Sequence, residues 1–474
     1  MAKVLLIDFG STYTKVTAVD TDTEEVLGTA QSFTTVETDI NEGLNNALLK
    51  LREKIGEIAF DKQLACSSAA GGLRMVAIGL VPDLTAKAAK QASLGAGAKV
   101  IKTYSYELTD GDLNEIDEIN PDILLLCGGT DGGNRENIIY NAGILAKSKR
   151  SFPIIIAGNR NAADECAELL KDKQTTVCEN VMPRLDIPNV APVQEEIRAL
   201  FLKQIVKAKG LTEAENLIKG ILMPTPSAML TAMKLLAKGT KSEPGIGDLL
   251  GVDVGGATTD IYSMSFGFPT NGMTALKGLR EDYAKRTVEG DIGMRYSIHG
   301  IVEAEGVSRI CELSGLDEDR INEIVDYLGT HTYVLPDGAG IEGDTLPGTD
   351  FTTDELKRLD FALASTAIEA AVTRHAGRLE EYYTPMGVSY MQTGKDLSKV
   401  SNVVVTGGAL IHTTRTAEIA SHALYSIRTP MSLKPKQADI LVDRKYILAS
   451  MGLLSTEYPD IALRIMKKEL IKDE

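Results

Sequence analysis

Residues 249–263 have the sequence LLGVDVGGATTDIYS, an apolar run that ends at an acid and enters a pair of glycines. The run before Asp253 predicts a buried strand, and Gly255 and Gly256 predict a sharp turn into a second strand. Backbone N–H groups in such a turn can approach an anion, and an acid beside it can hold hydrated Mg²⁺. Taken alone, the stretch is as typical of an ordinary tight turn as of a phosphate site.

A second copy of the pattern lies near the start of the chain. Strand, acid, x, glycine and a small residue, with threonine close behind, occur at Asp8–Thr12 and again at Asp253–Thr258. Each copy is followed by a returning strand, so we expect two hairpins with tight polar turns. Facing each other, they would clamp a triphosphate with N–H groups and hydroxyls, and the two acids would bind Mg²⁺ through water.

Two further glycine-rich turns occur in the chain. Val403–Thr406 predicts a buried strand that ends in Gly407, Gly408 and Ala409, where adenine or ribose could pass the bare backbone. Gly128–Gly133 is equally rich in glycine. It is either a ligand-binding turn or a simple connection between a strand and a helix.

The composition limits the classes of partner. The 474 residues carry a net charge of −16, which argues against non-specific binding to nucleic acid or to an anionic membrane. The five cysteines are odd in number and form no C-x-x-C pair, as expected for reduced thiols. The apolar runs are far shorter than a membrane span, and the first residues do not resemble a signal sequence. We therefore expect a cytoplasmic protein.

The remaining pattern is that of an α/β protein. Strands and helices alternate between about residues 64 and 181, which predicts a parallel sheet covered on both faces. Residues 353–383 predict one long helix with its N-cap at Thr352 or Thr353. Residues 439–454 predict a helix with one apolar face.

The three turns in this order resemble the motifs of a known superfamily. DFGSTYTK (8–15), DVGGATTD (253–260) and VVVTGGAL (403–410) resemble the phosphate-1, phosphate-2 and adenosine motifs of the actin/sugar-kinase/heat-shock-chaperone ATPases. Residues 224–228 resemble the first connecting helix of that superfamily. The resemblance implies a two-lobed actin-like α/β fold with duplicated ribonuclease-H-like domains, and ATP and Mg²⁺ as cofactors.

The resemblance also implies a division of the chain. Residues 1–63 would form the first ATPase lobe with the phosphate-1 hairpin, residues 191–248 the connecting helices, and residues 249–474 the second lobe. Residues 64–190 would be an additional α/β region, either a partner-binding insertion or a continuation of the first lobe.

A finer resemblance covers nearly the whole chain. CGGTDGGNRENIIYNA (127–142), NVMPRLDIPNVAP (180–192), MPTPSAML (223–230), KRTVEGDIGMRYS (285–297) and QTGKDL (392–397) resemble the MutL/GlmL family. This accessory family accompanies adenosylcobalamin-dependent glutamate mutase and related aminomutases. The resemblance implies an ATP-dependent reactivating chaperone whose partners are mutase subunits and which exchanges damaged cobalamin on the mutase. No D-x-H-x-x-G cobalamin signature occurs in this chain. Self-association stays open.

The resemblance assigns roles by position. Asp8 and Asp253 would flank Mg²⁺ and act in catalysis with Asp260. The residues that would contact the nucleotide are Gly10, Ser11, Thr12, Lys15, Gly255, Gly256, Ala257, Thr258, Thr259, Gly407, Gly408 and Ala409. Met223 stands where heat-shock chaperones carry a glutamate that helps to position water, so hydrolysis should be slow or should use another acid. Ala257 replaces a glycine of the chaperone pattern.

Two other functions stay open at this point. The same clamp phosphorylates small molecules in sugar kinases, and Asp260 is then the candidate substrate base. Alternatively, Met223 is compatible with a nucleotide-gated binding module that never hydrolyses ATP. The leading expectation is the chaperone-type ATPase, in which nucleotide-driven closure and opening act on a mutase subunit.

Overall fold

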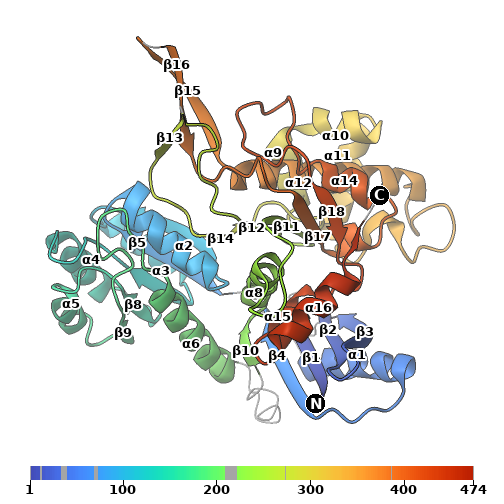
Figure 1. Cartoon of the computed structure of the whole chain (residues 1–474), viewed down its shortest axis with the longest axis horizontal. Helices are drawn as coiled ribbons and strands as arrows, with labels where there is room; N and C mark the ends of the chain where they lie inside the picture. The colour runs from blue at the N-terminus through green and yellow to red at the C-terminus, as the bar shows by residue number, and fades with distance from the viewer. Residues whose placement is uncertain are drawn as a thin grey trace. The chain divides into compact units, whose positions relative to one another are not determined.

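The computed structural model describes residues 2–10, 13–33, 40–68, 73–208, 221–272, 274–385 and 387–472 (Figure 1). The chain divides into two compact units. Unit 1 consists of Met1–Thr231, Gly278–Arg280 and Gly452–Glu457, and unit 2 consists of Ala232–Lys277, Glu281–Met451 and Tyr458–Glu474. The chain passes from one unit to the other within helix α8 (Thr225–Lys238) and helix α15 (Leu448–Leu454).

A mixed five-stranded sheet in unit 1 carries the first hairpin. Its order is β10-β4-β1-β2-β3, with bounds β1 (Lys3–Phe9), β2 (Tyr13–Asp20), β3 (Glu25–Phe33), β4 (Lys62–Ser67) and β10 (Ile221–Pro224). The first three strands form an antiparallel meander, and β4 and β10 run parallel to β1. Helix α1 (Ile40–Ile55) covers this sheet, because its Leu44, Ala47 and Leu51 share a core with Leu5 and Ile7.

Residues between β4 and β10 build a second sheet in unit 1. It is wholly parallel in the order β6-β5-β7-β8-β9, with bounds β5 (Arg74–Gly79), β6 (Lys99–Ser105), β7 (Ile123–Leu126), β8 (Ile154–Ile156) and β9 (Thr175–Val177). One face carries α2 (Lys87–Gly95) and α6 (Ala191–Ala208), and the other carries α3 (Asp110–Ile119), α4 (Glu136–Ala146) and α5 (Ala163–Leu169). A π-helical turn, η1 (Pro82–Ala86), precedes α2. The predicted parallel sheet with two covered faces is confirmed.

The sheet of unit 2 repeats the topology of the first sheet. Its order is β14-β12-β11-β17-β18-β19, with bounds β11 (Leu249–Val254), β12 (Thr259–Met264), β14 (Ala284–Glu289), β17 (Asn402–Thr406), β18 (Asp439–Val442) and β19 (Ile471–Lys472). Strands β11, β12 and β14 form an antiparallel meander, and β17 and β18 run parallel to β11. The fold is therefore the expected duplicated ribonuclease-H-like arrangement of an actin-like ATPase, with an additional α/β region in its N-terminal half. The domain boundaries at residues 63, 190 and 248 stay predictions.

Helices form most of the core of unit 2. Around the buried helix α12 (Thr353–His375) lie α9 (Ile298–Glu305), α10 (Val307–Ser314), α11 (Glu318–Thr330) and α14 (Thr416–Ser421). The other helices are the 3₁₀ turn η2 (Pro336–Gly338), α13 (Gly408–Ile411) and α16 (Pro459–Glu469). Within the described ranges, no helix combines the length and the apolar character needed to cross a membrane.

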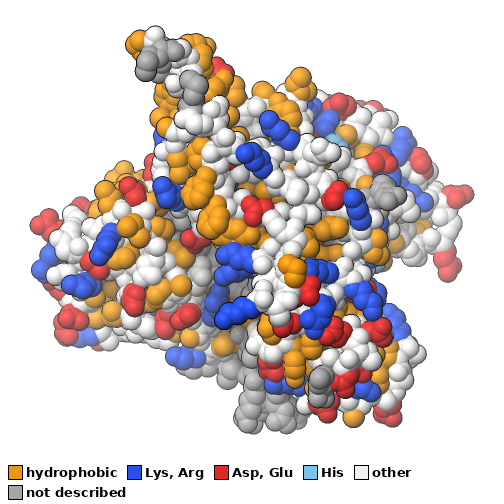
Figure 2. Space-filling view, viewed as in Figure 1, with side chains coloured by type: hydrophobic (Ala, Val, Ile, Leu, Met, Phe, Trp, Pro, Cys, Tyr) orange, Lys and Arg blue, Asp and Glu red, His pale blue; other side chains and the backbone are white. Residues whose placement is uncertain are grey.

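Two predicted helices are present but shorter than predicted, although the predicted N-cap at Thr352 is confirmed for the first. The helix expected over residues 353–383 ends at His375, and β15 (Arg378–Thr384) follows. It pairs with β16 (Gly387–Thr393) and, through it, with β13 (Thr274–Lys277). The helix ends where Ala376 takes an extended conformation, with ψ of 159°, and the chain then passes so close to Lys395 that a Cβ at Gly377 would lie 2.6 Å from its carbonyl oxygen. This hairpin, which we call the arm, extends away from the sheet of unit 2 (Figure 1), and apolar side chains gather on it (Figure 2).

The second of these helices is the one expected over residues 439–454. Its first part is β18, whose pairing with β17 buries Val442 completely, and only α15 is helical. The apolar run Ile440–Val442 is too short to separate a strand from a helix turn. The neighbouring strand decides between them.

Candidate functional site

The first hairpin of the sequence pattern is present in unit 1. The Gly10 N–H donates to the Tyr13 carbonyl at 3.1 Å, and the register pairs Asp8 with Lys15 across the two strands. A Cβ at Gly10 would lie 2.5 Å from the Tyr13 oxygen, so only glycine fits this position. Ser11 and Thr12, the predicted hydroxyl donors of this turn, lie outside the described residues.

Asp8 lies in a nearly closed polar cluster. Its carboxylate is 3% exposed and accepts from the Thr225 hydroxyl at 2.6 Å and from the Cys66 thiol at 3.4 Å. Lys15 Nζ lies 3.7 Å from the other carboxylate oxygen. These groups meet because β1, β4 and β10 are parallel and their carboxyl ends share one edge of the sheet. Burial and the nearby Asp8 raise the pKa of Cys66, so its thiol stays protonated and donates.

Sequence reasoning missed two members of this cluster, Thr225 and Cys66. In the sequence, Thr225 stands out only as part of the connecting-helix motif. The structure shows that it is the first residue of α8 and that its hydroxyl bonds Asp8 across 217 positions of sequence. The sequence signal for Thr225 is a hydroxyl residue directly after the strand β10. Parallel strands bring their carboxyl ends to one edge of the sheet, and Asp8 lies at that edge near the end of β1.

The second hairpin in unit 2 has the same geometry. The Gly255 N–H donates to the Thr258 carbonyl at 2.9 Å, and the register pairs Asp253 with Asp260. The coarse internal repeat is therefore a structural repeat, in which Gly10 corresponds to Gly255. An acid in unit 2 takes the place that Lys15 has in unit 1.

Three consecutive carbonyl oxygens of this turn are held by one segment, residues 294–297. Met294 N–H donates to Gly255, Arg295 and Tyr296 N–H both donate to Gly256, and the Ser297 hydroxyl donates to Ala257, at 2.9 to 3.1 Å. The segment can approach so closely because a Cβ at Gly293 would lie 2.3 Å from the Ala257 backbone.

This anchoring also sets the direction of the N–H groups. In a trans peptide the N–H points opposite to the C=O of the preceding residue. The N–H groups of Gly256, Ala257 and Thr258 therefore point away from the anchoring segment. Within the part of the chain that the structure describes, none of them donates to a backbone carbonyl outside regular strands and helices. Three N–H groups directed to one side are the donor set that an anion requires.

The two remaining residues of the second motif have other surroundings. Asp260 accepts from Arg286 Nε at 2.8 Å and Nη2 at 2.6 Å through one oxygen, and from Thr258 at 3.2 Å through the other. Both of its oxygens are engaged, which favours a positioning role over that of a free base. Thr259 is fully buried, and its hydroxyl has no hydrogen-bond partner among the described residues.

The adenosine motif forms the turn after β17. Gly407 has φ of 104°, and a Cβ there would lie 2.3 Å from the Val254 oxygen, so the turn lies against the end of β11. Gly408 is exposed and has open space where a Cβ would stand. The Ala409 side chain packs into the core instead. Of the three predicted residues, Gly408 is the one that leaves room for a ligand.

A further acid that sequence reasoning missed lies at the end of β18. Asp443 is 2% exposed and accepts from the N–H groups of Ile447 and Leu448 at 2.9 and 3.0 Å. It therefore caps the start of α15. In the first sheet the matching place beside Cys66 is taken by Met223.

The glycine-rich turn at residues 128–133 is closed by the protein itself. The N–H groups of Asp131, Gly132 and Gly133 donate to Pro183, Asn159 and Thr130. These N–H groups are not available to an anion, which favours the structural alternative for this turn.

The family model described as MutL protein matches residues 4–470. Protein MutL of Clostridium tetanomorphum is 48% identical over 477 residues, and the match covers 100% of both chains.

Solved structures give weaker likenesses. The activator of the 2-hydroxyisocaproyl-CoA dehydratase of Clostridium difficile, with bound ADPNP, matches with a TM-score of 0.31 and 10% identity, covering 100% of this chain and 99% of that one. Xylulose kinase of Lactobacillus acidophilus matches with a TM-score of 0.37 and 10% identity, covering 100% and 93%. Scores of this size add nothing to the strand orders, which establish the fold by themselves.

Proposed function

The chain belongs to the MutL protein family, and we propose that it is an ATP-dependent reactivating chaperone for an adenosylcobalamin-dependent, glutamate mutase-like enzyme. The chaperone part of this proposal rests on the family resemblance of the sequence. The nucleotide part is supported mainly by one observation, the three N–H groups that the anchored turn Gly255–Thr258 directs to one side.

The described residues would take the following roles toward a nucleotide and its metal ion. The N–H groups of Gly256, Ala257 and Thr258 would bind phosphate oxygens, and the open backbone at Gly408 would lie beside the nucleoside. Asp8 and Asp253 would hold Mg²⁺ through water. The Mg²⁺ ion would supply positive charge to the phosphates as the terminal bond breaks.

Unit 1 contributes a preorganised acid to this proposal. Thr225 and Cys66 fix the Asp8 carboxylate by donating to one oxygen, and Lys15 lies beside the other. With Met223 in place of a glutamate, hydrolysis should be slow. Slow turnover suits a protein whose nucleotide state controls a conformational step. The action on the mutase would be to release damaged cobalamin.

The proposal can be tested by the reactivation of an inactivated glutamate mutase in a buffer that keeps the thiols reduced. We expect activity to return only when this protein, ATP and Mg²⁺ are all present. Asp253→Asn should lower both ATP turnover and reactivation by about 10²-fold, the range for losing one group that stabilises charge. Asp439→Asn is the matched control, because Asp439 is exposed at the opposite end of the same sheet.

Equal reactivation without nucleotide would refute the chaperone mechanism. Phosphate transfer to sugars or carboxylic acids, with no effect on the mutase, would instead support the small-molecule kinase. ATP that stays intact after long incubation would support the nucleotide-gated binding module.

A further inference from the structure

A buried ion pair in unit 2 lies directly behind the phosphate-2 turn. Arg295 Nη1 and Nη2 donate to the two carboxylate oxygens of Asp360 at 2.8 and 3.0 Å. Both side chains are at most 5% exposed. Arg295 also donates through Nε to the Val334 carbonyl at 2.8 Å and through Nη1 to its own neighbour Met294 at 2.6 Å. The guanidinium is therefore held in one orientation.

On one side the pair is joined to the phosphate-2 turn. The backbone N–H of Arg295 is one of the donors that hold the Gly256 carbonyl, and Met294 holds that of Gly255. Because the Arg295 side chain is clamped to α12 through Asp360, its backbone cannot shift without breaking the pair. The position of the turn thus depends on α12.

On the other side the pair is joined to the adenosine turn. Asp360 accepts a third hydrogen bond, from the Asp337 N–H at 2.8 Å. Asp337 belongs to η2, which contacts helix α13, and the Thr413 hydroxyl that follows α13 lies beside the Asp337 carboxyl, where it opposes the rise in pKa that burial causes. Asp337 has φ of 58°, a strained value for a residue with a side chain, and these contacts hold it there. Helix α13 begins at Gly408 of the adenosine turn. Asp360 is therefore linked to the phosphate-2 turn through Arg295 and to the adenosine turn through Asp337.

Stability alone does not account for such a pair. Removing two charges from water is costly, and apolar side chains of similar volume often leave a protein equally stable or more stable. A bidentate Arg–carboxylate pair offers something that apolar packing does not, namely a fixed distance and a fixed angle between the groups that it joins.

We propose that Arg295 and Asp360 are positioning residues for the nucleotide. They set the phosphate-2 turn relative to the adenosine turn, so that one ATP molecule satisfies both at once. The inference rests on the proposed nucleotide binding. It predicts that a ligand spanning both turns depends on the pair, whereas a ligand that reaches only the adenosine turn does not.

The test compares the affinities of ATP and adenosine by calorimetric titration. The variant Arg295→Met/Asp360→Leu replaces the pair by apolar side chains of similar size. We expect it to lose ATP affinity by at least about ten-fold and to keep adenosine affinity within about two-fold. The melting temperature should fall, because the Val334 and Met294 carbonyls and the Asp337 N–H lose their partners, so binding is compared well below the melting transition.

The matched control is Arg320→Met/Glu355→Gln. Arg320 makes a similar bidentate pair with Glu355 in the first turn of α12: its Nε and Nη2 donate to the two carboxylate oxygens at 2.8 and 3.1 Å. Its other described charged partners are Glu323 and Asp350, which belong to neither turn. The glutamine retains an acceptor for the capping contacts with Thr352. This variant should bind ATP as the wild type does.

Each outcome decides. Unchanged ATP affinity in a folded Arg295→Met/Asp360→Leu protein would overturn the inference, as would an equal loss for ATP and adenosine or the same loss in the control. Should that variant not fold, Arg295→Lys keeps the charge but lacks the fork, and it should lower ATP affinity several-fold in a folded protein. If Arg295→Lys bound ATP normally, the positioning role would be excluded. Failure of the wild type to bind ATP would refute the proposed function itself, a result distinct from all of these.

Discussion

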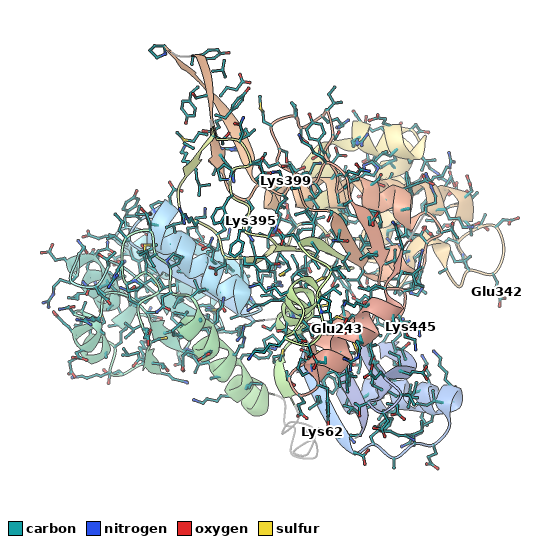
Figure 3. The ribbon with its side chains drawn as sticks, viewed as in Figure 1. Lys62, Glu243, Glu342, Lys395, Lys399 and Lys445 are labelled. Atoms are coloured by element: carbon teal, nitrogen blue, oxygen red, sulfur yellow. The ribbon has the colours of Figure 1, made fainter. Side chains whose placement is uncertain are left out.

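Replacing Lys395 by methionine should remove a large pH dependence from the stability of unit 2. Lys395 follows β16 at the base of the arm (Figure 3). Its side chain is buried, with the residue 1% exposed. Its Nζ donates to the Tyr283 carbonyl at 2.8 Å and lies 3.4 and 3.5 Å from the hydroxyl and carbonyl of Ser263 on β12. The amine therefore connects the arm to the sheet that carries the phosphate-2 turn.

The size of the effect follows from the pKa of this amine. Burial, followed by the neighbouring charge of Lys285, lowers the pKa of Lys395 from 10.5 to about 7, although the carboxylates of Glu281, Asp282 and Asp248 act in the opposite direction. Between these values the unfolded chain binds a proton that the folded protein does not, so the free energy of unfolding rises with pH. The whole window corresponds to about 5 kcal/mol, of which roughly 2 kcal/mol lies between pH 7 and 9.

The assay is chemical denaturation of the wild type and of Lys395→Met at several pH values in this range, followed by circular dichroism. The variant removes one of two donors to the Tyr283 carbonyl, which keeps the Ser265 N–H at 3.0 Å, and this loss costs about 0.5–1.5 kcal/mol at every pH. The diagnostic quantity is therefore the slope of the unfolding free energy against pH and not its absolute value. Lys399→Met is the control, because Lys399 is exposed four residues further along the chain.

We expect the free energy of unfolding of the wild type to rise between pH 7 and 9 because of Lys395, and that of Lys395→Met to lack this rise. Parallel slopes in the two proteins would refute it, because they would mean that the amine has the same protonation state in the folded and unfolded chains. Titration of the lysine ε-carbons by NMR would locate the error.

Two further predictions concern the turns. Thr225→Val should destabilise the protein by about 1–2 kcal/mol, since it removes the hydroxyl that donates to buried Asp8, and Thr225→Ser should restore most of the loss in a thermal melt. A melt of Thr225→Val that matches the wild type would contradict this. Gly293→Ala should press a methyl group against the Ala257 backbone, lowering ATP affinity in a binding titration more than it lowers stability. Gly272→Ala, where the added methyl meets open space, should change neither, and equal effects of the two substitutions would count against the close-packing argument.

Local sequence determined the backbone of the site. An apolar run, an acid and glycines specify a strand, a turn and a returning strand wherever they occur, because these residues act on their own φ and ψ angles. The hairpins at Gly10 and Gly255, the turn at Gly407 and the alternation of strands and helices before residue 181 were predictable for this reason.

Tertiary structure decided which side chains meet. The partners of Asp8 come from positions 58 and 217 residues away, and Arg295 meets Asp360 across 65 residues, so no local pattern contains these contacts. The same holds where the predicted helices were wrong. Residues 378–384 and 439–442 are strands because a neighbouring strand pairs with them, and a hydrogen-bonding partner elsewhere in the chain outweighs a local preference of a few tenths of a kcal/mol per residue. The sequence thus determined where the chain turns. Only the tertiary structure decided which distant residues contact each turn and hold it in place.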